Sequence, residues 1–96
     1  MQVEIITPES EIFKGEADAV QLPGLDGSFQ VLNNHAPIIS ALAEGSVKIN
    51  LTNDHQGYDS MSGEIEHDPS NDKILRVKIK GGIMEMMNNK VIVLAE

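Results

Sequence analysis

Strict alternation of apolar and polar residues marks two stretches of the chain. Residues 47–51 are Val-Lys-Ile-Asn-Leu, and residues 74–80 are Ile-Leu-Arg-Val-Lys-Ile-Lys. Successive side chains of a β-strand point to opposite faces, so a strand with one face in the core and the other in water has this period of two. The pattern therefore predicts a strand in each stretch, with one exposed face.

Apolar runs between turn residues predict further strands, at residues 3–7, 16–22, 28–32, 83–87 and 90–95. Gly15 is expected to bend or bulge the chain just after Phe13. Asn88 and Asn89 lie between two apolar runs and predict a two-residue hairpin turn, because asparagine tolerates positive φ. No helical periodicity extends beyond a turn or two, so short strands at close spacing predict an all-β sandwich or barrel.

Turn residues crowd into residues 22–42, which hold two of the four prolines and two of the eight glycines. Pro23-Gly24 and Asp26-Gly27 each predict a turn, a second loop covers residues 33–37, and the apolar run 38–42 follows. Loops of this kind either turn corners in an all-β domain or present a surface to a partner. Loop chemistry alone leaves both interpretations open.

Residues 52–72 differ in character, because they are polar and acidic with almost no aliphatic side chains. They are predicted to form an extended polar loop or hairpin, with a weak strand around residues 58–65. The last strand differs in the opposite way, since residues 91–95 are apolar at every position. One face of a sandwich strand is expected to be polar, so either another segment or another protein must cover the second apolar face. We favour a partner, because 96 residues leave little chain for covering.

Length, charge and composition limit the possible functions. The 96 residues are predicted to form one domain, residues 1–96. A net charge of −8 gives the wrong sign of field for nucleic acid or for anionic lipid headgroups. The lack of cysteine excludes disulfides and thiol chemistry. No apolar stretch approaches the ~20 residues that span a bilayer and no secretory signal is visible, so we expect a soluble, cytosolic chain without direct membrane insertion.

Candidate chemistry is sparse. A metal site would have to combine His35, His55 and His67 with Asp54, Glu66 and Asp68. The histidines match no recognisable strand pair, so solvated or capping roles are favoured. No nucleophile–base signature and no phosphate-binding loop is present, and we expect neither catalysis nor a cofactor. The basic stripe Arg76, Lys78 and Lys80 is either a solvated face that discourages edge pairing or a contact strip for an acidic partner.

Five motifs follow one another along the chain. They are Val-Glu-Ile-Ile-Thr-Pro-Glu at 3–9, Phe-Lys-Gly-Glu at 13–16, Leu-Pro-Gly-Leu-Asp-Gly-Ser-Phe at 22–29, Asn-His-Ala-Pro at 34–37 and Asn-Lys-Val-Ile-Val-Leu-Ala-Glu at 89–96. In order and spacing they resemble the N-terminal domain of the epsilon subunit of bacterial F-type ATP synthase. The chain departs from that family at Gln30 and Asn33, which usually are Gly and Pro, and in a longer 52–72 segment. It also ends where most members continue into a C-terminal helical hairpin, so we expect it to lack the inhibitory function of that hairpin.

The resemblance implies a two-sheet β-sandwich of short, mainly antiparallel strands. It also implies a non-catalytic rotor subunit of the central stalk, which joins the gamma subunit to the membrane c-ring and couples proton flow to ATP synthesis at the cytoplasmic side of the bacterial plasma membrane. The residues carried over to the c-ring end are Pro23, Gly24, Leu25, Asp26, Gly27, Ser28, Phe29, Gln30, Asn34 and His35. On the last strand we expect gamma to contact Val91, Val93 and Ala95.

Two other classes of function stay open at this point. One is a small β-sandwich module that binds a sugar or a peptide. It would need exposed aromatic residues, and the whole chain has only Phe13, Phe29 and Tyr58. The other is a metal-dependent β-barrel enzyme that uses the histidines.

Overall fold

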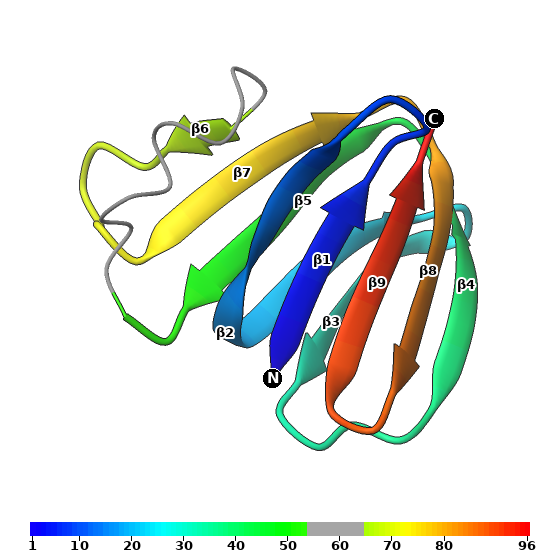
Figure 1. The fold of residues 1–96 in the computed structure, drawn as a ribbon, viewed down its shortest axis with the longest axis horizontal. Helices are drawn as coiled ribbons and strands as arrows, with labels where there is room; N and C mark the ends of the chain where they lie inside the picture. The colour runs from blue at the N-terminus through cyan, green and yellow to red at the C-terminus, as the bar shows by residue number, and fades with distance from the viewer. Residues whose placement is uncertain (54–64) are drawn as a thin grey trace.

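The computed structural model describes residues 1–53 and 65–96, and every regular element in these ranges is a strand (Figure 1). The strands are β1 (Gln2–Ile6), β2 (Glu11–Gly24), β3 (Gly27–Leu32), β4 (Ile38–Leu42), β5 (Gly45–Leu51), β6 (Ile65–His67), β7 (Ile74–Ile79), β8 (Gly82–Met87) and β9 (Lys90–Ala95). The predicted all-β class is confirmed.

Two layers of strands are joined by the long strand β2. Its first half pairs with β1, from Ile6 opposite Glu11 to Gln2 opposite Glu16. Its second half lies between β3 and β5, where Val20 faces both Val31 and Ile49. One layer therefore runs β4-β8-β9-β1 with the first half of β2, and Figure 1 shows its strands β1, β9, β8 and β4 side by side. The other layer runs β3-β2-β5-β7-β6.

All strand pairs are antiparallel except β1 with β9, which are parallel neighbours. This arrangement is the two-sheet sandwich of mainly antiparallel strands that the resemblance implies. The bend expected at Gly15 is wrong, because Gly15 pairs regularly with Val3 in the middle of the β1–β2 ladder. The irregular positions lie on either side of it, between Ile5 and Ile6 on β1 and between Ala17 and Ala19 on β2.

The core between the layers is aliphatic apart from one ring. Phe13 is its largest fully buried side chain, and Met84 and Met86 of the same cluster are also fully buried. Among the described residues, no polar or charged side chain is buried. Stability therefore depends on close packing of inward-facing Val, Ile, Leu and Met, since burial of apolar surface is the main favourable contribution.

Asparagines shape one end of the sandwich. Asn88 and Asn89 have φ of 53° and 58°, which confirms the predicted two-residue hairpin between β8 and β9. Asn34 in the β3–β4 loop also has positive φ, at 63°. Its backbone N–H donates a hydrogen bond of 2.7 Å to Oδ1 of Asn89, so the loop and the hairpin turn are tied together.

The polar segment 52–72 is described only in part, because residues 54–64 lie outside the described residues. The strand predicted around 58–65 falls almost entirely within that gap. The described remainder contains β6, which pairs with β7 as a short antiparallel hairpin. This hairpin is fastened by Asp68, whose carboxylate accepts hydrogen bonds from Ser70 Oγ at 2.7 Å, Ser70 N at 2.8 Å and Arg76 Nη1 at 2.9 Å.

Gly82 should be the least replaceable glycine of the sandwich. Its φ is +146°, and a Cβ there would lie 2.2 Å from the carbonyl oxygen of Leu94 on the neighbouring strand. Gly27 has a similar φ of +123° but no atom within 4 Å of such a Cβ. We expect Gly27→Ala to lower the free energy of unfolding by about 1 kcal/mol through backbone strain, and Gly82→Ala by about 3 kcal/mol or more. Urea unfolding of both variants measures the difference, and equal losses would contradict the clash.

Asp68 should make stability depend on pH in the acid range. Hydrogen bonds from the Ser70 side chain, then from Arg76 and the Ser70 backbone, hold the pKa of its carboxyl well below the ordinary value of 3.8. A depressed pKa stabilises the fold above the unfolded value, and the contribution is lost as the pH falls below it. Near neutral pH the wild type should therefore have a higher melting temperature than Asp68→Asn. The difference between the two melting temperatures should shrink as the pH falls below 3.8. Ser70→Ala should show part of the same loss in thermal unfolding followed over pH, and a gap that stays constant in acid would contradict this assignment.

Candidate functional site

The ten residues expected at the c-ring end all lie on or beside β3. Pro23 to Gly27 form the end of β2 and the β2–β3 turn, and Leu25 at its tip is 65% exposed. On β3 itself, Ser28 and Gln30 are exposed and Phe29 is half-buried. Asn34 and His35 belong to the loop after β3, where Nδ1 of His35 lies 2.7 Å from the carbonyl oxygen of Ala36.

The two loops of this group lie at opposite ends of β3 rather than at one tip. The six-residue strand separates them, and at ~3.3 Å per residue that separation is roughly 20 Å. Among the described strands β3 hydrogen-bonds only to β2, so its other edge is open. A pocket of about 380 Å³ lies at the turn end, lined by the β2–β3 turn and by Ser40 and Ala41 of β4. A partner that contacts both loops must therefore extend along β3.

The residues expected to face gamma on β9 point the other way. Val91 and Val93 are fully buried and Ala95 is 6% exposed, because all three belong to the core between the layers. Their side chains are not available to a partner in this structure. The outward residues of β9 are Lys90, Ile92 and Leu94, and Leu94 is 55% exposed.

The outer face of this layer carries an apolar surface that is interrupted by Glu85. Leu94 lies between Ile6 of β1 and Ile83 of β8, and Ile92 belongs to the next row on the same face. In that row Glu85 of β8 lies between Ile92 and Ile39 of β4, and Ile39 is 70% exposed. We call Ile6, Ile39, Ile83, Ile92 and Leu94 the outer patch. A pocket of about 350 Å³ lies on it.

The sequence predicted that a partner covers an apolar face of the last strand, but it did not show that Ile92 and Leu94 form that face or that neighbouring strands extend it, although one signal could have identified the face. Lys90 lies two residues before Ile92 and four before Leu94, so the three share a face of β9. Lysine is almost never fully buried without a partner, so its face of the strand is the outer one. The same argument applies to Glu85, which shares a face of β8 with Ile83.

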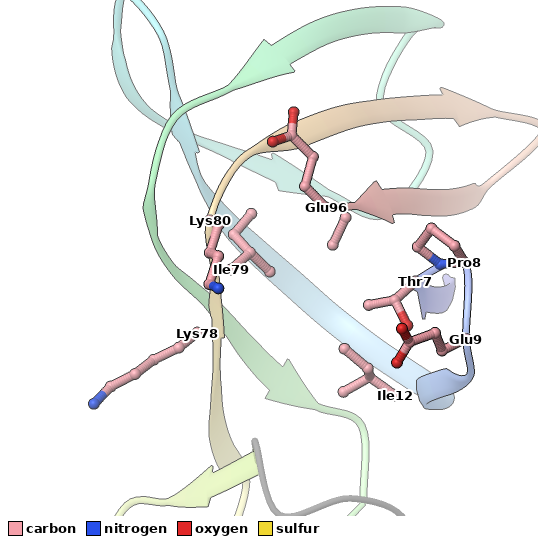
Figure 2. Close-up of a pocket in the computed structure, with 9 residues that line it drawn as sticks. Thr7, Pro8, Glu9, Ile12, Lys78, Ile79, Lys80 and Glu96 are labelled. Atoms are coloured by element: carbon pink, nitrogen blue, oxygen red, sulfur yellow. The ribbon is translucent and has the colours of Figure 1, made fainter.

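The basic stripe on β7 is largely neutralised by its own hairpin. Arg76 pairs with Asp68 at 2.9 Å and Lys78 with Glu66 at 3.5 Å, which favours the solvated-face interpretation. Lys80 lies beside a pocket of about 440 Å³ between β7 and the β1–β2 turn. Figure 2 shows Thr7 and Glu9 on one side of this pocket and Lys78 extending away from it. Its lining mixes acidic, basic and aliphatic groups and converges on no single chemistry.

No metal centre is evident in the part of the chain that the structure describes. No three histidine or acidic side chains come together there in a way that could hold an ion. His55 and Asp54 of the proposed cluster lie outside the described residues. No helix in the described ranges is long and apolar enough to cross a membrane.

Comparison with known proteins agrees with the fold. The model of the ATP synthase delta/epsilon chain β-sandwich domain matches residues 1–63. The ATP synthase epsilon chain of Salinibacter ruber is 36% identical over 96 residues, 100% of this chain and 58% of that protein. The epsilon chain of Chlorobium limicola is 36% identical over 95 residues, 99% of this chain and 88% of that protein.

A solved structure shares the architecture at much lower sequence similarity. It is a chain in the cryo-EM structure of the central stalk and c-ring of Tetrahymena thermophila mitochondrial ATP synthase, with a TM-score of 0.69 and 19% identity. The match covers 99% of this chain and 62% of that chain. This match supports the fold, and the family model and the sequence matches show that the chain belongs to the delta/epsilon chain β-sandwich family of ATP synthases.

Proposed function

We propose that this chain is a non-catalytic subunit of the rotor of a proton-translocating F-type ATP synthase. It joins the gamma subunit to the membrane c-ring, so that rotation driven by ion flow reaches the catalytic head and supports ATP synthesis. The complex lies at the cytoplasmic side of the plasma membrane, and this chain is peripheral to the bilayer. Family membership supports the proposal, as does the structural neighbour from a central stalk and c-ring.

The outer patch is the observation that carries the proposal. Exposed contiguous apolar surface is a hallmark of a protein–protein contact site on a soluble domain. Here it extends over four adjacent strands, β1, β9, β8 and β4. Gamma covers this face in the proposed complex, at Ile92 and Leu94 rather than at the buried Val91 and Val93.

The c-ring contact is assigned to β3 and its two flanking loops. Besides Leu25, these loops expose polar groups and backbone, which suits the polar loops of a ring at the membrane surface. The open edge of β3 adds unpaired backbone donors and acceptors. The ring lies along the strand in this proposal, because only that placement brings Leu25 and His35 to one partner.

A sandwich of this kind suits a mechanical connection. Its ladders of cross-strand hydrogen bonds resist shear, and its close-packed core has low compressibility. Because β2 belongs to both layers, displacement of one layer is transmitted to the other through covalent chain as well as packing. Torque is thereby carried between two partners on different faces without deformation of the domain.

A negative charge placed on one contact surface at a time should distinguish the two contacts. Leu94→Asp puts a carboxylate into the gamma face, and Leu25→Asp puts one at the tip of the β2–β3 turn, where both leucines are exposed. We expect Leu94→Asp to weaken binding to purified gamma about 30-fold while it leaves binding to detergent-solubilised c-ring unchanged. Leu25→Asp should show the reverse pattern. Titration calorimetry with each partner measures both affinities.

Reconstitution then tests the function itself. Each variant should restore less proton-driven ATP synthesis than wild type when it is added to synthase depleted of this subunit. The leucines are exposed, so both variants should melt close to wild type, which separates binding loss from unfolding. A chain that neither binds gamma nor restores synthesis would overturn the proposed function.

A further inference from the structure

Glu85 lies in the middle of the outer patch. Its cross-strand partners are Ile39 on β4 and Ile92 on β9. Ile83 lies two residues before it on the same face of β8, and the pocket on this face is lined by Glu85 together with Ile6, Ile83, Ile92 and Leu94. The exposed carboxylate is therefore surrounded by aliphatic side chains.

A second carboxylate on the same face, that of Glu4, differs because it has ion-pair partners within the fold. Glu4 of β1 is the other cross-strand partner of Ile92. Its carboxylate oxygens lie 3.7 Å from Nζ of Lys14 and 3.4 Å from Nζ of Lys90. Glu85 makes no ion pair within the ranges 1–53 and 65–96. Within the described residues, the fold thus supplies cations for Glu4 and none for Glu85.

Covering the patch would change the surroundings of Glu85 sharply. In the free chain water solvates its carboxylate. A purely apolar partner would remove that water and leave a buried, unpaired charge, which is strongly unfavourable. A partner that brings a cation to this position replaces the lost water with charge-assisted hydrogen bonds. The patch therefore accepts one kind of complementary surface and rejects a uniformly apolar one.

Resting on the proposed docking of gamma, we propose that the gamma surface over the outer patch carries a single lysine or arginine that pairs with Glu85. Glu85 is then the residue that makes the contact specific, while the surrounding isoleucines and Leu94 supply apolar area. An arginine would suit the position well, because its guanidinium is weakly hydrated and can bind both carboxylate oxygens. The proposal concerns one charge on the partner, and it holds for either side chain.

Substitution of Glu85 by a more apolar residue tests the proposal, because an apolar partner and a cationic partner predict changes in binding affinity of opposite direction. Glu85→Leu makes the patch more apolar, so it should tighten binding to an apolar partner and weaken binding to one whose cation is left unpaired. We expect calorimetric titration with purified gamma at constant ionic strength to show about tenfold weaker binding for Glu85→Gln and about 30-fold weaker binding for Glu85→Leu. Glu44→Gln removes the same charge at an exposed loop away from the patch and should leave the affinity unchanged.

Parallel titration of Leu94→Asp distinguishes failure of this inference from failure of the docking face. If Leu94→Asp weakens binding but Glu85→Leu binds gamma as tightly as wild type or more tightly, gamma does cover the patch and the cation pairing is wrong. If Leu94→Asp leaves the affinity unchanged, the face itself is wrongly assigned and the pairing falls with it. Thermal unfolding of each variant confirms that the chain is folded. Recovery of Glu85→Lys binding by a Lys→Glu or Arg→Glu change in gamma would identify the partner residue.

Discussion

Hydrogen bonding by β2 to both layers is the constraint on which the structure depends. The strand is 14 residues long, and its two halves pair with different neighbours. The strand leaves β1 after Glu16 and joins β5 at Ala17, and the β2–β5 ladder shifts register between Ala17 and Ala19. Phe13 on the first half and Val20 on the second are both fully buried, so the strand contributes to the core along its whole length. Any movement of one layer relative to the other would break pairs on β2.

This constraint gives the two proposed contact surfaces a fixed relation to each other. The outer patch belongs to the layer of β1, β9, β8 and β4, and the open β3 edge belongs to the other layer. Each surface is held by strands that also pair with β2 or with its direct neighbours. The chain can therefore present different chemistry on its two sides, aliphatic around Glu85 and polar around His35, without a hinge between them.

Local sequence patterns predicted the strands well. They predicted poorly how the strands pair and which faces are buried. Alternation at residues 47–51 and 74–80 and the Asn88-Asn89 turn were sufficient because strand period and turn geometry are local properties. Because residues 91–95 are apolar on both faces, the run itself does not indicate which face is buried. That information is carried by the neighbouring residue Lys90. The positions of the loops around β3 depend on which strands pair, and periodicity does not contain that information. Gly15 shows the same limit, because regular pairing with Val3 decided its conformation.

The parallel pairing of β1 with β9 joins two strands that lie far apart in the sequence. Residues 2 and 90 are partners, so residues 3–89 must be looped out before this pair can form. Contacts between such distant residues slow folding, because the entropy of closing the loop is lost before the contact is gained. During synthesis β1 can reach β2 early, but its other edge stays open on the ribosome until β9 emerges. Pairing on both edges of β1 is therefore complete only after β9 has been synthesised.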